Sequence, residues 1–278
     1  MVFYGRVREL TQLLANGDQS VELDVAALQV ARIEFGDVPV GPFLEILDSY
    51  ATELGQRLSG REDGPAWIRA ANEYLFEELG FHGNQVDYYN PRNSCLNEVL
   101  TGRTGIPITL CIVYMEIARR HGRSICGIGL PGHFVVRYDD GDYAAYLDPF
   151  HGGRVLTEKE CLELSRVSGL DVSANASRLL APNSKRQMML RMLYNLRAIY
   201  FRQQAWTKSI QVLDLLVEAR PKAAEEYKQR ATAHLQLRRT RAALADFEKY
   251  LALAPKAEDR AAVARQVQVL RGWLASLN

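Results

Sequence analysis

The chain has 278 residues and a net charge of +1, with 47% hydrophobic and 24% charged residues. These values are ordinary for folded domains, and the length allows one large domain or two of average size. No uncharged apolar run reaches the roughly 18 residues that a membrane helix needs, and charges interrupt the N-terminal segment, so we expect neither a membrane span nor a secretory leader. The four cysteines have no CxxC spacing, which predicts reduced thiols and a cytoplasmic protein.

The charges are divided unevenly along the chain. Residues 182–278 hold 18 Lys and Arg against 8 Asp and Glu, whereas residues 1–181 hold 16 against 25. We expect the two parts of the chain to attract each other. The basic helices of residues 182–278, including Arg186, Arg191, Arg197 and Arg202, would then lie near the acidic part. An acidic partner molecule is the alternative. The basic residues lack interleaved aromatic side chains, so nucleic acid is not an expected partner.

The first hundred residues read as helices. Asp24 is expected to cap a helix over 24–33, Pro42 opens one that continues to about residue 58, and a third over 66–79 ends at Gly80. Residues 81–94 are too rich in Gly, Asn and Pro for a regular element. Ser94 is expected to cap a short helix over 95–100.

A small sheet is predicted next. The run 108–120 reads as a helix that ends at Gly122, and residues 126–129, 134–138 and 144–147 read as strands. The turn 139–142 predicts a hairpin between the last two strands. Thr157 and Glu160 have the spacing of a capping box and predict a further helix.

The last third of the chain repeats with a period of 34 residues. Pro221 and Pro255 are one period apart, a spacing typical of tetratricopeptide (TPR) repeats, which are pairs of antiparallel helices. Arg197 and Arg230 depart from the pattern, which prefers Gly and Leu there. A final helix over 261–274 is expected to cover the apolar end of the array. It would do so with Val263, Val267, Leu270 and Trp273.

Two polar residues flank the predicted sheet. His133 follows Pro131-Gly132 at the start of one strand, and Asp148 ends the next. Antiparallel neighbours would bring them into contact, so the carboxylate would orient the imidazole as in a catalytic triad. The alternative is that Asp148-Pro149 is a turn and His133 a partly buried polar residue.

A nucleophile is missing from its usual place. A catalytic thiol gains acidity at a helix N-terminus, but the helix before the sheet begins near Pro107. Thr109 offers only a hydroxyl, Cys111 lies one turn deeper and reads as a core residue, and Cys95 precedes the helix. The histidines lack paired ligand spacing and no Gly-rich loop follows a strand, so no metal and no nucleotide cofactor is expected. The histidines concerned are His82, His121, His133 and His151.

The sequence resembles the bacterial SirB-type family, transglutaminase-like proteins with C-terminal TPR repeats. The resemblance covers about residues 24–255. It is carried by Leu75 to Asn84, Tyr88, Pro91, Asn93-Ser94, Gly105 to Leu110, Tyr114, Glu116, Ala118, Arg119, Gly122, Pro131 to Phe134 and Asp148 to Phe150. It implies a papain-like core in which His133 and Asp148 fall on triad positions and Pro107-Ile108 falls near the Cys position. A related domain in a eukaryotic F-box protein implies an adaptor role.

Together these observations predict an α+β fold with two domains. Residues 1–181 would form a transglutaminase-like domain with a helical N-terminal part and a small antiparallel sheet, and residues 182–278 an all-α TPR domain. The predicted function is a non-catalytic module that binds a protein or peptide through its cleft or its TPR repeats. The cleft would hold the remnant triad His133, Asp148 and Cys111, and the binding residues Asn84, Tyr88, Asn93, Ser94 and Arg119. The alternative is a cysteine-dependent hydrolase or acyltransferase that uses Cys111 or Cys95 with His133 and Asp148.

Overall fold

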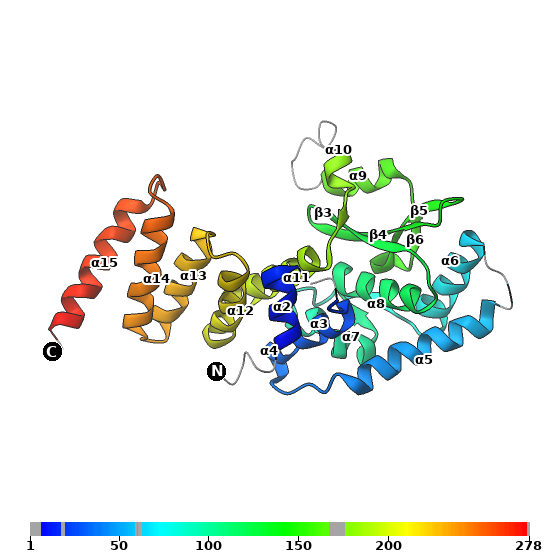
Figure 1. Cartoon of the computed structure of the whole chain (residues 1–278), viewed down its shortest axis with the longest axis horizontal. Coiled ribbons are helices and arrows are strands. Elements are labelled where there is room, and N and C mark those ends of the chain that lie inside the picture. Colours follow the sequence, from blue (N-terminus) through cyan, green and yellow to red (C-terminus); the bar gives the residue numbers. More distant parts are fainter. Residues whose placement is uncertain (1–6, 18–19, 59, 61–62, 167–175, 277–278) are drawn as a thin grey trace. The chain divides into compact units, whose positions relative to one another are not determined.

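The computed structural model describes residues 7–17, 20–58, 60, 63–166 and 176–276 (Figure 1). They form two compact units: Met1–Leu13 with Gly17–Met192, and Leu14–Asn16 with Leu193–Asn278. The fold is α+β, as predicted, with helices, a small antiparallel sheet and then helical repeats. The division falls inside helix α11 (Lys185–Arg202), a little after the predicted boundary at residue 181.

The N-terminal part of the first unit is helical. Its elements are α2 (Arg8–Asn16), α3 (Leu23–Val30), α4 (Arg32–Phe35), α5 (Gly41–Leu58), α6 (Gly64–Asn72) and the π-helix η1 (Glu73–Glu78). The helix predicted from Pro42 is confirmed, and the third predicted helix is interrupted by the wider turns of η1 before Gly80 takes a left-handed φ of 76°. Asp24 is not a cap, because it is the second residue of α3 and its carboxylate binds two arginines.

The irregular segment and the central helix follow. A short parallel pair joins β1 (His82–Gly83) to β2 (Thr104–Gly105), and between them lie the 3-10 helix η2 (Pro91–Ser94) and α7 (Leu96–Gly102). Ser94 does not cap α7, because Cys95 occupies the N-cap position. Helix α8 (Pro107–Arg120) is buried on almost every side, as its apolar sequence requires.

The three predicted strands are confirmed and two more complete a five-stranded antiparallel sheet. The strands β3 (Ile125–Leu130), β4 (His133–Asp139), β5 (Ala144–Asp148), β6 (Arg154–Leu156) and β7 (Pro182–Asn183) lie in the order β6-β5-β4-β3-β7. The register pairs Val136 with Leu147, so the end of β5 lies beside the start of β4. The hairpin forms because the Asp140 carboxylate accepts the N–H groups of Asp142 and Tyr143.

Helices cover both faces of the sheet. Helix α8 packs under β3 and β4, while α9 (Glu158–Arg166) and α10 (Ala176–Leu179) lie on the opposite face (Figure 1). On the α9 side, Ile128, Val135 and Cys161 belong to one apolar cluster. The predicted capping box at Thr157 is present, with hydrogen bonds in both directions to Glu160.

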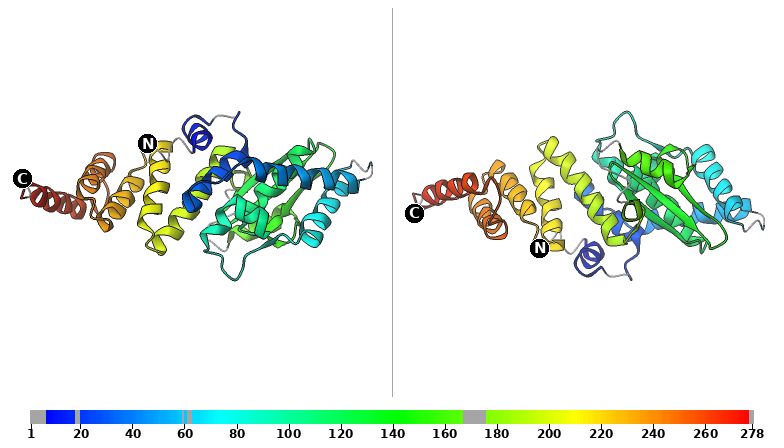
Figure 2. Two further views of the ribbon diagram at one scale, coloured as in Figure 1. Left: turned by 90° about the horizontal axis from the view of Figure 1, so that it is seen from below. Right: turned by 90° about the horizontal axis from the view of Figure 1, so that it is seen from above.

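The second unit contains successive antiparallel helices, the yellow-to-red series in Figure 2. They are the end of α11, then α12 (Trp206–Ala219), α13 (Ala224–Gln236), α14 (Thr240–Leu253) and α15 (Arg260–Ala275). Val263 and Val267 of α15 are buried in the cluster that contains Phe247 and Tyr250, and Leu270 packs against it, as predicted for a covering helix. Trp273 was expected to join them, but it is 50% exposed.

The two arginines that depart from the repeat pattern, Arg197 and Arg230, form ion pairs with neighbouring helices. Arg230 of α13 forms ion pairs with Asp214 of α12 and Asp246 of α14, and Arg197 pairs with Glu226 at 2.5 Å. These arginines therefore join neighbouring helices at positions where the repeat pattern favours small or apolar contacts. Among the helices that the structure describes, none is both long and apolar enough to cross a membrane.

Candidate functional site

A compact turn at the end of β5 builds the centre of the site. The Asp148 Oδ1 atom accepts the backbone N–H of Phe150 at 3.1 Å, and the Asp148 carbonyl accepts the N–H of Gly153 at 2.9 Å. Gly152 and Gly153 have φ values of 70° and 72°, which favour glycine. The 3-10 helix η3 (Pro149–His151) lies inside this turn, so the chain folds back and carries the His151 ring beside the Asp148 carboxylate.

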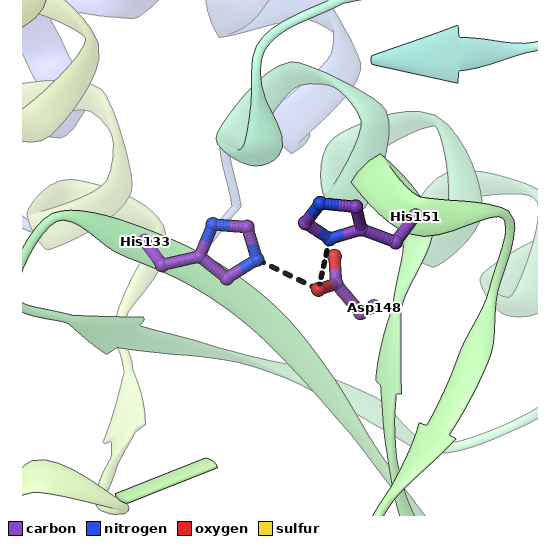
Figure 3. A group of neighbouring side chains, drawn as sticks. All are labelled: His133, Asp148 and His151. Atoms are coloured by element: carbon purple, nitrogen blue, oxygen red, sulfur yellow. Dashed lines mark hydrogen bonds and ion pairs between the residues drawn. The ribbon is translucent and has the colours of Figure 1, made fainter. Parts of the chain in front are cut away.

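Two imidazoles share one carboxylate oxygen (Figure 3). Oδ2 of Asp148 lies 2.9 Å from Nε2 of His133 and 2.7 Å from Nδ1 of His151. The Asp148 side chain is 2% exposed, compared with 12% for His133 and 46% for His151. Burial alone would raise the pKa of the Asp148 carboxyl, but the two imidazoles outweigh burial and hold this pKa below its usual value. The predicted contact between His133 and Asp148 is thus present, with a second histidine added.

An aromatic wall borders the cluster. The Phe150 ring stands edge-on to the rings of His133, His151 and Tyr88, with centroid separations of 6.0, 5.1 and 6.2 Å. Gly83 is required behind it, because a Cβ at that position would overlap the Phe150 ring. Tyr88, a predicted binding residue, is therefore connected to the cluster through Phe150, and burial raises the pKa of its hydroxyl.

Arg191 fixes the turn that precedes His133. Its Nη2 atom donates to the carbonyls of Leu130 and His133 at 2.7 and 2.6 Å, and burial lowers the pKa of its guanidinium. In the sequence, Arg191 reads only as one charge of a basic helix. Its position beside the site depends on α11 packing near the β3–β4 turn, which no local pattern indicates.

The N-terminus of α8 carries no nucleophile. Ile106 is the N-cap residue and Pro107 the first residue of the helix. The Thr109 hydroxyl is completely buried, donates to the Asn93 carbonyl at 2.8 Å and accepts the N–H of Ile106 at 3.1 Å. Thr109 therefore stabilises the start of the helix and the loop before it.

The two cysteines that were considered as nucleophiles are both buried. The Cys111 thiol contacts the Phe134 carbonyl at 3.5 Å, and burial, reinforced by Asp148, raises its pKa well above the usual value. Cys95 lies in an apolar cluster with Ala31 and Val38. In the part of the chain that the structure describes, neither sulfur is hydrogen-bonded to the His133 ring. Since the reactive form of cysteine is the thiolate, this geometry does not activate Cys111.

Three further predicted binding residues lie, like Tyr88, in the segment before α7. The Asn84 amide donates to Asn93 Oδ1 at 3.0 Å, and the Asn93 amide donates to the carbonyls of Asp87 and Tyr88. These contacts hold the loop in place. The Ser94 hydroxyl is buried without a hydrogen-bond partner among the described residues. Whether any of them contacts a ligand stays a prediction.

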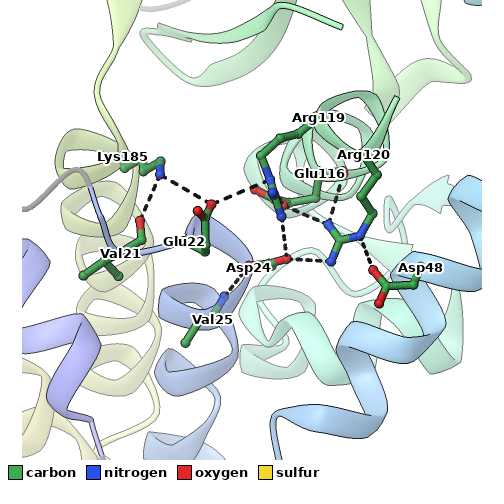
Figure 4. Close-up of polar contacts among 9 residues, drawn as sticks. All are labelled: Val21, Glu22, Asp24, Val25, Asp48, Glu116, Arg119, Arg120 and Lys185. Atoms are coloured by element: carbon green, nitrogen blue, oxygen red, sulfur yellow. Dashed lines mark hydrogen bonds and ion pairs between the residues drawn. The ribbon is translucent and has the colours of Figure 1, made fainter. Parts of the chain in front are cut away.

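Arg119, the fifth predicted binding residue, lies at the other end of α8 in an ion network (Figure 4). Twelve residues separate it from Pro107, roughly 18 Å at 1.5 Å per residue. Arg119 and Arg120 both bind the nearly inaccessible carboxylates of Asp24 and Glu116. Burial, together with the Asp24 charge, raises the pKa of Glu116 to about 7 in spite of the arginines. The structure thus does not bring Arg119 together with His133.

Sequence analysis missed His151 and Phe150 as members of the site. A local signal existed, because Phe150 and His151 directly follow Asp148-Pro149 and precede two glycines, which is a turn pattern. Spacing of histidines and cysteines within one element does not indicate this cluster. His133 and His151 are 18 positions apart and meet only because β4 and β5 pair.

Comparisons with known proteins agree with this fold. A family model described as the transglutaminase-like superfamily matches residues 42–194, and a tetratricopeptide-repeat model matches residues 196–268. A UPF0162 protein of Xylella fastidiosa is 34% identical over 94% of this chain and 92% of its own length. A UPF0162 protein of Pseudomonas aeruginosa is 28% identical over 82% of this chain and 83% of its own length. Human F-box only protein 21 is 39% identical over 34% of this chain and 16% of its own length. The chain therefore belongs to the transglutaminase-like superfamily and to the UPF0162 family.

Proposed function

We propose that this protein is a non-catalytic binding or adaptor module in which a transglutaminase-like cleft and a TPR array recognise protein or peptide partners. One observation carries the proposal: Pro107 stands at the helix start where a thiol enzyme has its nucleophile, while the nearest thiol, Cys111, is buried with a raised pKa. TPR repeats commonly mediate protein interactions, and the F-box relative supports an adaptor role by likeness alone.

The competing function, a hydrolase or acyltransferase that uses Cys111 or Cys95, makes a sharp counter-prediction. A thiol paired with His133 would react rapidly with iodoacetamide near neutral pH and lose this reactivity in His133→Ala. An adaptor would show slow labelling of both cysteines, with no dependence on His133. Mass spectrometry of labelled peptides across pH separates these outcomes, and Cys126, which is partly exposed, serves as an internal reference in every sample.

A binding experiment tests the positive part of the proposal. Peptides selected by display against the full chain should bind Cys111→Ser as tightly as the wild type, since the thiol has no chemical role. The same peptides should lose affinity for either Tyr88→Ala in the cleft wall or Trp273→Ala on the exposed face of α15. Failure to select any peptide, or affinity that depends on Cys111, would contradict an adaptor function.

Three narrower assignments belong to the same proposal. The motifs between Leu75 and Phe134 support placement in the SirB-type family. The four cysteines have no CxxC spacing, which supports work in the cytoplasm. We keep residue 181 as the end of the transglutaminase-like domain.

A further inference from the structure

Asp148 contacts two imidazoles, one more than the carboxylate of a catalytic triad contacts. A carboxylate that orients a catalytic imidazole needs a single histidine. Here the same oxygen of Asp148 faces His133 and His151, which approach from β4 and from η3 (Figure 3). His151 is therefore left unexplained by the likeness to thiol enzymes.

We propose that His133, Asp148 and His151 form a binding site for one divalent transition-metal ion of the zinc class. One ligand atom from each residue lies within 4.8 Å of the other two. Bonds of about 2.0–2.2 Å from zinc to nitrogen and oxygen place two ligands of one ion roughly 3.0–3.5 Å apart. The two nitrogen–oxygen separations are 2.9 and 2.7 Å, so the carboxylate oxygen must move away from each nitrogen by a few tenths of an ångström when an ion enters. The two nitrogens, which lie within 4.8 Å of each other, must turn toward the same ion.

The donor set matches this class of ion. Two imidazole nitrogens and one carboxylate oxygen suit zinc and its first-row neighbours, whereas calcium and magnesium prefer oxygen ligands. Each neutral imidazole must offer a lone pair at the nitrogen that now faces Asp148, so its ring proton moves to the other ring nitrogen. Three protein ligands leave one tetrahedral position open for water or for a group of a bound partner.

The surroundings are built like those of a metal site. The second oxygen of Asp148 is held by the Phe150 N–H, which fixes the orientation of the carboxylate. The Phe150 ring forms an apolar boundary against both imidazoles. The half-exposed His151 side chain gives an ion access from solvent, while the buried Asp148 supplies a negative charge in a place of reduced dielectric.

Metal titration of the full chain tests this inference. Calorimetry with Zn²⁺, and absorbance with Co²⁺ as a coloured substitute, should show one ion per chain after removal of metal with a chelator. His151→Ala and Asp148→Asn should each weaken binding by at least about 100-fold, since even outer contacts of metal ligands contribute about 10–100-fold. His82→Ala is the matched control, because the exposed His82 ring contacts Gly80 and Thr104 and not the cluster, and it should leave affinity unchanged.

His151→Ala is the decisive variant, since its side chain is nearly half exposed and its removal should leave the fold intact by circular dichroism. Binding that persists in His151→Ala, or that falls equally in His82→Ala, would overturn the proposal. So would the absence of stoichiometric binding in the wild type. A Co²⁺ spectrum with thiolate charge-transfer bands would assign the ion to cysteine and have the same consequence.

Discussion

The ion triad of the TPR unit allows one prediction to be worked out in detail. Arg230 binds Asp246 through Nε and Nη2 at 2.8 and 2.7 Å, and binds Asp214 through Nη1 at 2.8 Å. The Asp246 side chain is only 8% exposed and that of Asp214 29%. Burial already raises the pKa of Asp214 in spite of Arg230. Replacing Arg230 by Ala therefore leaves two acidic groups close together without their cation.

Removing one partner of a buried ion pair costs about 3–5 kcal/mol, and partial exposure of Asp214 places the Arg230→Ala loss toward the lower end. Because the chain has two units, global unfolding is not expected to follow a two-state transition. Hydrogen exchange of the full chain resolves the units, and amides of α13 and α14 should lose protection by roughly 100-fold, since 1.4 kcal/mol corresponds to a factor of ten.

Two further variants sharpen this test. Arg265→Ala removes an exposed arginine from α15 and should change protection little. Replacing Arg230, Asp214 and Asp246 together by Leu removes the charges as a set, and stability should recover to near the wild-type level. A loss below about 1 kcal/mol in Arg230→Ala, or an equal loss in Arg265→Ala, would refute the view that this triad stabilises the array.

Two other predictions concern the first unit, and a third concerns the uneven distribution of charge along the chain. His133→Ala should lower the free energy of unfolding by about 1–3 kcal/mol, because it removes one hydrogen-bond partner of the buried Asp148, whereas Cys111→Ser should cost less. Urea denaturation compares them, with Trp206 and Trp273 replaced by Phe so that Trp67 alone reports the first unit. Glu116 has a folded-state pKa near 7, above its unfolded value, so its ionisation reduces stability as pH rises from about 4.5 to 7. Glu116→Gln should therefore gain stability relative to wild type between pH 5 and 8, and a constant difference in urea midpoints would contradict this. Finally, the uneven charge predicts that lysine-to-carboxylate cross-links between residues 1–181 and 203–278 become rarer as salt rises, since screening acts over about 10 Å at 0.1 M; yields insensitive to salt would argue against attraction.

The sequence was informative wherever a local pattern decides the structure. The apolar periodicity of 108–120, the β-branched and aromatic run of 134–138 and the 34-residue repeat are all local patterns, and these elements are confirmed. Asp24 and Ser94 were misread as caps because capping depends on the exact first residue of a helix, which a sequence pattern locates only to within one or two residues. The N-cap residues are Glu22 and Cys95 instead. Asp24 is held instead by arginines nearly a hundred positions away.

Only part of the candidate site could be predicted from the sequence, for a related reason. The pairing of His133 with Asp148 follows from two adjacent strands, so it could be expected. The positions of His151 and Arg191 depend on a tight turn and on a helix that packs from beyond residue 180. Long-range contacts of this kind produce no repeating pattern of residues by which a single sequence would reveal them.

The turn that carries His151 is also connected to the helices beneath it. The Asn72 amide donates to the Gly153 carbonyl at 2.7 Å, while its oxygen accepts the Tyr114 hydroxyl at 3.1 Å. A side chain at Gly153 would collide with Asn72, so the packing there is tight. One amide thus joins the end of α6, the middle of α8 and the turn. A ligand that displaces the His151 turn would strain this link, and the displacement would therefore act on α6 and α8 as well.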